Sequence, residues 1–233
     1  MKRSFLKQHS VHVFIALYVF LLPLQSFSSE KKPEPDLKLD RVIKRIKAKE
    51  KSLKTVIAKY KQIKKTYLLH EPLHSEGLIY YDSSGKLLMK VTSPSPFLIL
   101  FKNNTFLVYY PEISKAEERY VGNVENIIGK YLGIGQPVEA LKEQYEIQPA
   151  TKTNSGGYYL KMIPQKQAVA KHVDSIEVFV NPETWLPEQI VFTEVKGDQT
   201  TLWLQFISIN QPLPPGIFSI ALPDIRRDDD EDR

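Results

Sequence analysis

The chain has 233 residues, of which 42% are hydrophobic and 25% are charged, and its formal net charge is +5. This is the composition of an ordinary globular protein, with enough apolar side chains for one sizeable domain. The absence of cysteine excludes disulfides, catalytic thiols and cysteine-ligated metal sites.

The first 28 residues have the pattern of a secretory signal peptide. Lys2, Arg3 and Lys7 form a basic start, an apolar run extends from Val13 to Leu24, and small residues precede a cleavage position after Ser28. The run is about a dozen residues long, shorter than the roughly 20 of a membrane-spanning helix. An uncleaved signal anchor is the alternative. Cleavage lowers Lys and Arg from 32 to 29 against 27 Asp and Glu, so the net charge becomes +2. We therefore expect a mature protein in the periplasm.

A polar, proline-containing linker over residues 29–36 leads into a helical pattern that begins at Leu37. Apolar residues recur there three or four positions apart, among them Val42 and Ile46, and lysines fill the positions between them. The pattern predicts an amphipathic helix with a basic exposed face.

The next segment, Thr55–Leu69, is compatible with two structures. The spacing of its apolar residues favours a continuation of the helix. Val56 and Tyr60 also lie on one side of an alternating pattern, with Lys59 on the other side, as in a half-buried strand. Periodicity alone favours the helix here.

After the turn "HEPLHSEG" the pattern changes to short strands. The first five strands are each about five to seven residues long, and the breaks between them, such as "DSSG", "SPSP" and "NN", have good turn chemistry. The predicted strands are Gly77–Tyr81, Lys86–Thr92, Phe97–Lys102, Thr105–Tyr110, Lys115–Val121, Gly157–Ile163, Asp174–Val180, Pro187–Lys196 and Gln199–Asn210.

Other elements interrupt or follow these strands. Val124–Gly135 and Pro137–Tyr145 form a helical patch, and "PQKQAVAKH" is a polar loop. The segment "PPGIFSIALP" predicts a helical turn and an edge strand, and residues 224–233 form a charged tail. Together these elements predict an antiparallel sheet of about ten strands. Either helices cover one face of this sheet, or the sheet curls on itself.

Alternation predicts which side chains face inward. Leu87, Met89 and Val91 share one face of their strand, and the same logic places Ile176 and Val178 inward in a later strand. In the run "FLILF" both alternating sets are apolar, so both phases remain open there.

No group of residues has the spacing of a catalytic, metal or nucleotide site. His70 and His74 could bind a metal only with Glu71 or Glu76 as a third ligand, and exposed turn histidines are the simpler interpretation. His172 has no nucleophile motif to serve. "GKYLGIG" lacks the Lys-Ser/Thr of a phosphate loop, and "DDDED" lacks the spaced ligands of a calcium loop. We therefore expect no enzyme, no metal, no cofactor and no nucleic-acid partner. The apolar surface is then either a closed core or a cavity.

Several elements occur in a recognisable order. Tyr60 and Gln62 are followed by Gly77 and Tyr80, then by the hairpin "LILFKNN", the aromatic pair of "YYP", a helical patch and closing hairpins that end in "PPGIFSIALP". This order and spacing resemble the LolA-type periplasmic carriers of outer-membrane lipoproteins.

The resemblance covers residues 37–223 and implies a mainly β fold. It implies a half-open antiparallel barrel, or curled sheet, of about 10–11 strands, with helices as a lid over an apolar cavity. It also implies that the first helix ends near Leu53 and that a strand follows, and we adopt this interpretation. Many members carry an Arg-Pro pair where this chain has Ser83 and Ser84. That arginine is associated with holding the lid closed, a role without a counterpart here.

By resemblance, the function is that of a carrier without enzymatic activity or cofactor. It would shield the acyl chains of lipoproteins, a glycolipid or another lipid between the inner and outer membranes. The expected partners are the acylated lipoprotein or other lipid cargo, an inner-membrane ABC transporter and an outer-membrane acceptor, and the carrier would act as a monomer. The alternative is a periplasmic regulator of the RseB type, which senses lipids or lipoproteins and usually has a second C-terminal domain.

Strand phase and the resemblance together give a set of candidate binding residues. The predicted lid residues are Val42, Ile46, Ile127, Ile128 and Leu132. The predicted cavity residues are Val56, Tyr60, Ile79, Tyr81, Leu87, Met89, Val91, Leu98, Leu100, Val108, Leu160, Met162, Ile176 and Val178.

Overall fold

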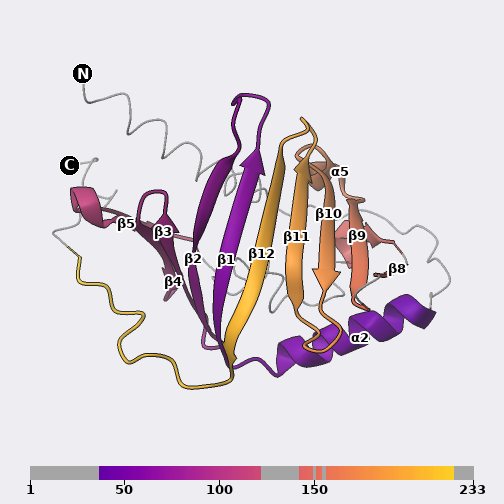
Figure 1. The fold of residues 1–233 in the computed structure, drawn as a ribbon, viewed down its shortest axis with the longest axis horizontal. Helices are drawn as coiled ribbons and strands as arrows, with labels where there is room; N and C mark the ends of the chain where they lie inside the picture. Colours follow the sequence, from indigo (N-terminus) through magenta and orange to yellow (C-terminus); the bar gives the residue numbers. More distant parts are fainter. Residues whose placement is uncertain (1–36, 122–141, 149–150, 154–155, 223–233) are drawn as a thin grey trace.

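A computed structural model describes residues 37–121, 142–148, 151–153 and 156–222 (Figure 1). The predicted signal peptide, most of the predicted helical patch and the charged tail lie outside the described residues. The boundaries of the predicted domain therefore remain predictions.

One antiparallel sheet forms the body of the protein. Within the described residues its twelve strands follow the order β6-β5-β4-β3-β2-β1-β12-β11-β10-β9-β7, with β8 also paired to β9 (Figure 1). Its strands are β1 (Thr55–Lys65), β2 (Leu73–Asp82), β3 (Lys86–Ser93), β4 (Phe97–Lys102), β5 (Thr105–Tyr110), β6 (Lys115–Tyr120), β7 (Tyr145–Ile147), β8 (Thr151–Lys152), β9 (Tyr158–Pro164), β10 (Val173–Val180), β11 (Pro187–Glu194) and β12 (Gln199–Ile209).

The first and last strands pair at the centre of this sheet. β1 lies between β2 and β12, so one meander runs outward from β1 to β6 and the other runs outward from β12 to β7 (Figure 1). Among the described residues, β6 and β7 are the edge strands of the sheet and do not pair with each other.

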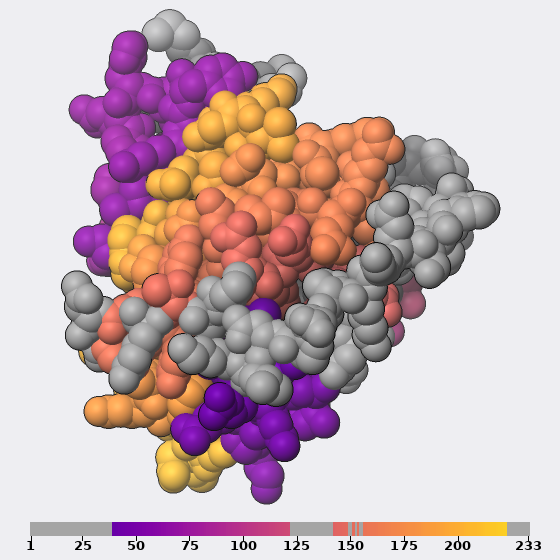
Figure 2. All heavy atoms as spheres, turned by 90° about the vertical axis from the view of Figure 1, so that its right-hand side faces the viewer, coloured from indigo at the N-terminus to yellow at the C-terminus, as the bar shows by residue number. Residues whose placement is uncertain are grey.

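Helix α2 (Leu37–Lys51) lies below the closing strands β9 and β10 (Figures 1 and 2). Asp40 in its first turn and Lys49 and Lys51 in its last turn complement the helix dipole. Its apolar side chain Val42 packs against Leu160 of β9, and Arg45 lies 4.9 Å from the ring centre of Trp185. Two short helices, η1 (Pro111–Ile113) and α5 (Gln167–Ala170), lie in connections.

The two faces of the sheet differ in composition because alternate side chains of a strand point to opposite faces. We define the inner face as the one that carries Val56 and Tyr60, and the outer face as the opposite one. Tyr60 is paired with Gly77 of β2 and Leu204 of β12, so these positions share the inner face. Its main buried cluster consists of Leu53, Val56, Ala58, Tyr60, Ile79, Leu87, Val91, Ile99, Phe101, Phe106, Val108, Leu186 and Leu204.

Gly77 allows β2 and β3 to approach closely on this face. A Cβ atom at Gly77 would lie 2.0 Å from the backbone oxygen of Lys90, so no side chain fits there.

The C-terminal segment, residues 211–222, covers part of the outer face. Figure 1 shows it running from the end of β12 toward the β3–β5 side of the sheet. Its side chains Ile217 and Phe218 pack with Leu88, Leu100 and Leu107, which form a second apolar cluster on the outer face. This contact buries apolar side chains that a one-sided sheet would leave in solvent.

The predicted mainly β, antiparallel fold is confirmed, and so is the replacement of the long helix by a strand at Thr55. Three local predictions were wrong. The turn predicted before Gly77 is the start of β2, because β1 is long enough to pair with it from Leu73 onward. The polar loop contains α5. Residues 142–144 of the predicted helical patch are helical, and strand β7 begins at Tyr145, the last residue of that prediction. No strand forms in the described part of "PPGIFSIALP", which packs by its side chains instead.

Candidate functional site

The inner face is the most extensive apolar surface of the described chain, and it is built from side chains of consecutive strands. In β1, Val56 and Tyr60 are 2% and 3% exposed. Through the register, Tyr81 of β2 continues this row to Leu87 of β3 and Phe101 of β4. Each step places one apolar side chain beside the next across the strands, so the inner face is continuously apolar in this direction.

Most of the predicted cavity residues share this face. The residues that the register and the buried clusters bring together there are Val56, Tyr60, Ile79, Tyr81, Leu87, Met89, Val91, Val108, Leu160, Met162, Ile176 and Val178. Their role in binding remains a prediction.

Two predicted cavity residues lie on the opposite face, which corrects the predicted phase of β4. Leu98 pairs with Lys90 and Leu100 pairs with Leu88, both on the outer face. Ile99 takes the inward position instead, with 9% of its surface exposed. The sequence does not reveal which residues of β4 face inward, because Leu98 and Leu100 on the outer face are also apolar. They are apolar because the C-terminal segment covers them.

The predicted lid residues are only partly within the described chain. Val42 and Ile46 of α2 pack with Leu160 and Val180, so this helix covers the β9–β10 end of the sheet. The other three, Ile127, Ile128 and Leu132, lie outside the described residues.

Sequence reasoning missed the inward side chains of the closing strand β12. Leu202, Leu204 and Phe206 belong to the main inner cluster, beside Ile190 of β11. The alternating stretch "LWLQFISI" carried the necessary signal.

Tyrosine hydroxyls are the main polar groups in this apolar wall. Burial raises the pKa of Tyr60, against the opposing effect of a hydrogen bond with Ser75. Burial also raises the pKa of Tyr110, with a further contribution from Glu117. For Tyr145 burial raises the pKa to about 12. These three hydroxyls are therefore neutral at physiological pH.

An ion pair bounds the polar end of the inner face. Nζ of Lys64 lies 3.0 Å from Oε1 of Glu194, and the two side chains are 10% and 16% exposed. Gln62 and Lys64 continue the row of Tyr60 along β1, so the inner face changes from apolar to polar along this strand.

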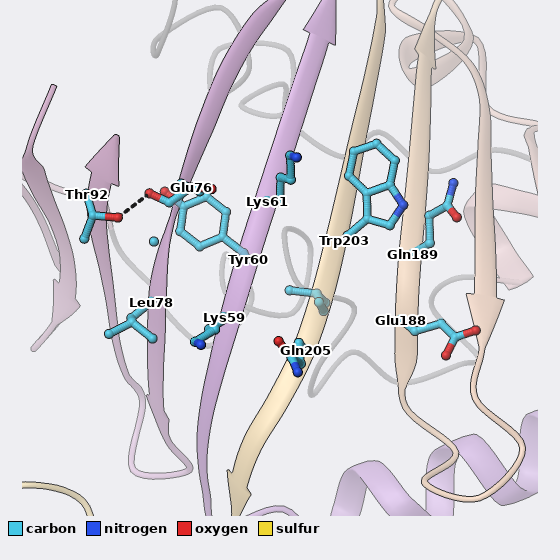
Figure 3. A pocket seen from close by; sticks show the side chains of 12 residues that line it. Lys59, Tyr60, Lys61, Glu76, Leu78, Thr92, Glu188, Gln189, Trp203 and Gln205 are labelled. Atoms are coloured by element: carbon cyan, nitrogen blue, oxygen red, sulfur yellow. Dashed lines mark hydrogen bonds between the residues drawn. The ribbon is translucent and has the colours of Figure 1, made fainter. Parts of the chain in front are cut away.

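A depression of about 740 Å³ lies over β2, β1, β12 and β11 (Figure 3). Most of its lining side chains belong to the outer face, since Lys61 pairs with Glu76 and Trp203, and Lys59 with Gln205. Its lining combines charged and amide side chains with apolar groups such as Leu78 and Trp203, and it is open to solvent. This depression is therefore separate from the predicted apolar cavity.

Neither metal nor membrane-spanning features are found in the described ranges. They contain no group of three or more His, Asp or Glu residues arranged to hold a metal ion. His70 lies in the connection before β2 and His74 lies in β2, and both are exposed. None of the described helices is long and apolar enough to cross a membrane.

A comparison with protein families decides the classification. The family model for "Outer membrane lipoprotein carrier protein LolA" matches residues 51–221, which is well over half of the chain and includes all twelve strands of the described sheet. The protein belongs to the LolA family. Among curated proteins, no sequence matches this chain significantly.

One solved structure in particular supports the fold of this LolA-family protein. An uncharacterized conserved protein from Thermus thermophilus matches with a TM-score of 0.52 and 9% identity, over 81% of this chain and 96% of that one. Two further matches have lower scores. A LolA superfamily protein from Nitrosomonas europaea gives a TM-score of 0.41 and 10% identity, over 79% and 98%. The lipoprotein LppX from Mycobacterium tuberculosis gives 0.45 and 12%, over 77% and 99%.

Proposed function

We propose that this LolA-family protein is a periplasmic carrier that shields the acyl chains of lipoproteins, or of a related lipid, between the inner and outer membranes. The observation that carries the proposal is the continuous inner face, where apolar side chains of β1, β2 and β3 pack in register beside those of β4 and β5. Family membership supports the same conclusion.

The physical task of such a carrier is to keep hydrocarbon out of water. Each exposed methylene costs about 0.8 kcal/mol, so a chain of some 16 carbons costs on the order of 10 kcal/mol. Partly buried inner-face residues offer adaptable contacts, and Met89 in particular has a flexible, polarizable side chain that suits ligands of variable shape. This function requires no catalytic group and no cofactor.

Transport in one direction requires partners, because this chain shows no nucleotide-binding motif. An inner-membrane ABC transporter would load the carrier and an outer-membrane acceptor would receive the cargo, with the carrier acting as a monomer. Helix α2, with Val42 and Ile46, is the described part of the proposed lid. The other proposed lid residues, Ile127, Ile128 and Leu132, lie outside the described residues. Opening of the lid would expose the inner face and release the lipid.

Native mass spectrometry of the protein purified from its own envelope tests this proposal. Lipids are extracted from any complex and identified. A co-purifying acylated peptide is the expected result. A glycolipid or phospholipid would keep the carrier function and change the cargo. A protein that is empty and also fails to bind a fluorescent apolar probe would overturn the proposal and leave the inner face as an ordinary core.

A pulse-chase measurement distinguishes a carrier from the alternative, a lipid-sensing regulator. Loss of a carrier delays the arrival of its cargo in the outer membrane, whereas loss of a sensor leaves transport intact and changes the expression of other genes.

A further inference from the structure

Three large apolar side chains are exposed at one end of the central strands. Tyr67 and Leu68, in the β1–β2 connection, are 68% and 64% exposed, and Val195, in the β11–β12 connection, is 54% exposed. The β1–β2 connection stands above its neighbours at the top of the sheet in Figure 1, and Figure 2 shows it as a protrusion beside β12. We call these three residues the apolar tip. Exposed apolar side chains that gather at one place indicate an interaction site.

Hydrogen bonds tie the β11–β12 connection to the β1–β2 connection and to the segment before β10. The backbone N–H of Tyr67 donates to Oδ1 of Asp198 at 3.2 Å, and the Asp198 residue is only 8% exposed. The N–H of Val195 donates to the backbone oxygen of His172 at 3.2 Å. The Lys64–Glu194 ion pair lies directly below and links β1 to β11. The apolar tip is therefore presented by a cross-linked support.

Exposed lysines flank the apolar tip. Lys65, Lys171 and Lys196 are exposed there, beside the exposed carboxylates of Glu71 and Asp174 and the buried carboxylate of Asp198. Apolar and aromatic side chains flanked by lysines match the layers of a bilayer with anionic lipids, where leucine reaches the acyl region, tyrosine lies at the interface and lysine meets the phosphates.

We propose that the apolar tip is a membrane-docking site that binds the surface of bilayers containing anionic phospholipids. Docking there brings the polar end of the inner face toward the membrane, because Lys64 is next to the tip in β1. That consequence for cargo transfer rests on the proposed carrier function, whereas the binding of the membrane does not.

The test measures flotation with vesicles of phosphatidylethanolamine and phosphatidylglycerol, and with vesicles of phosphatidylcholine alone. The protein is taken as recovered after export, with its N-terminus established by mass. The double variant Tyr67→Ser/Leu68→Ser should weaken partitioning to the anionic vesicles by at least about tenfold, because two apolar side chains no longer insert. Binding should also weaken at high salt.

A matched control removes exposed apolar side chains elsewhere. Ile113 and Tyr120, near the β6 edge, are 50% and 77% exposed, so Ile113→Ser/Tyr120→Ser makes a comparable change in surface. This control should bind within about twofold of the wild type. Equal losses in both double variants, or no binding of the wild type to anionic vesicles, would overturn the proposal.

A second measurement does not depend on losing affinity. In a Leu68→Trp variant, the indole emission in excess of that from the native Trp185 and Trp203 should shift to shorter wavelength on adding anionic vesicles and should be quenched by brominated acyl chains. In a Tyr120→Trp variant neither change is expected. An unshifted, unquenched signal from Leu68→Trp in vesicle-bound protein would show that another surface binds, which also overturns the proposal.

Discussion

The ammonium group of Lys64 lies 3.0 Å from the carboxylate of Glu194, and the contact links β1 to β11 across the intervening strand β12. Both side chains are largely withdrawn from solvent, so each charge depends on the other for compensation. The pair ends the apolar row of the inner face on β1 and supports the connections above it.

Removal of one member of this pair should destabilise the protein more than removal of both. Lys64→Met leaves the Glu194 carboxylate without its partner and should lower the free energy of unfolding by about 2–4 kcal/mol. The double variant Lys64→Met/Glu194→Leu buries no charge and should recover more than half of that loss. Urea unfolding at pH 7 measures both values. Equal stability of the single and double variants would show that the Glu194 carboxylate becomes hydrated when Lys64 is lost.

The sequence allowed most strands to be placed but not all of their faces. The bounds of β4 and β5 were predicted correctly, because polar breaks on either side of short apolar runs are a local signal. The inward-facing residues of β4 were not predicted correctly. Leu98 and Leu100 pack against a segment more than a hundred positions later in the chain, and this contact leaves no local signal. The strand at Thr55 was placed by resemblance, because its lysines and apolar residues also fit a helical period.

The C-terminal segment should detach when its main aromatic contact is lost. Phe218 packs with Leu88, Leu100 and Leu107, and its backbone oxygen accepts a hydrogen bond of 3.4 Å from Nζ of Lys102. Phe218→Ala should lower the free energy of unfolding by about 1–3 kcal/mol and expose the outer apolar cluster.

Limited proteolysis followed by mass spectrometry measures this detachment. Cleavage within residues 211–222 should become several times faster in Phe218→Ala, and the neighbouring exposed residue supplies the control Ser219→Ala, which should be cleaved like the wild type. If both variants keep the wild-type rate, the segment does not depend on Phe218 for its position.

Two adjacent residues of β3 can separate a binding wall from a passive outer face. Met89 packs against the inner cluster, whereas Lys90 is exposed on the outer face. Met89→Trp fills space on the inner face and should reduce the affinity for a fluorescent apolar probe by at least about tenfold. Lys90→Trp adds the same group outside and should leave affinity unchanged. A probe titration with a circular-dichroism check of folding gives the comparison, and equal affinity in both variants would locate the probe elsewhere.

Two tyrosines of the inner face should respond in opposite ways to loss of the hydroxyl at pH 7. The hydroxyl of Tyr145 is buried, and the structure as described gives it no hydrogen-bond partner, whereas that of Tyr60 bonds with Ser75. Tyr145→Phe should therefore raise the free energy of unfolding by about 1 kcal/mol, and Tyr60→Phe should lower it by a similar amount. Urea unfolding compares the two variants.

The alkaline range tests the same burial independently. Burial raises the folded-state pKa of Tyr145 from its ordinary 10.0 to about 12, so the unfolded chain loses this proton first. The contribution of this hydroxyl to the free energy of unfolding is therefore fully present below pH 10, and it is lost as the pH rises toward 12. Tyr145→Phe removes this contribution and should flatten the decline, and Tyr60→Phe should act in the same direction because its pKa is also raised by burial. Wild-type slopes in both variants between pH 9 and 11 would mean that these hydroxyls are hydrated in the folded protein, and that water enters the inner face.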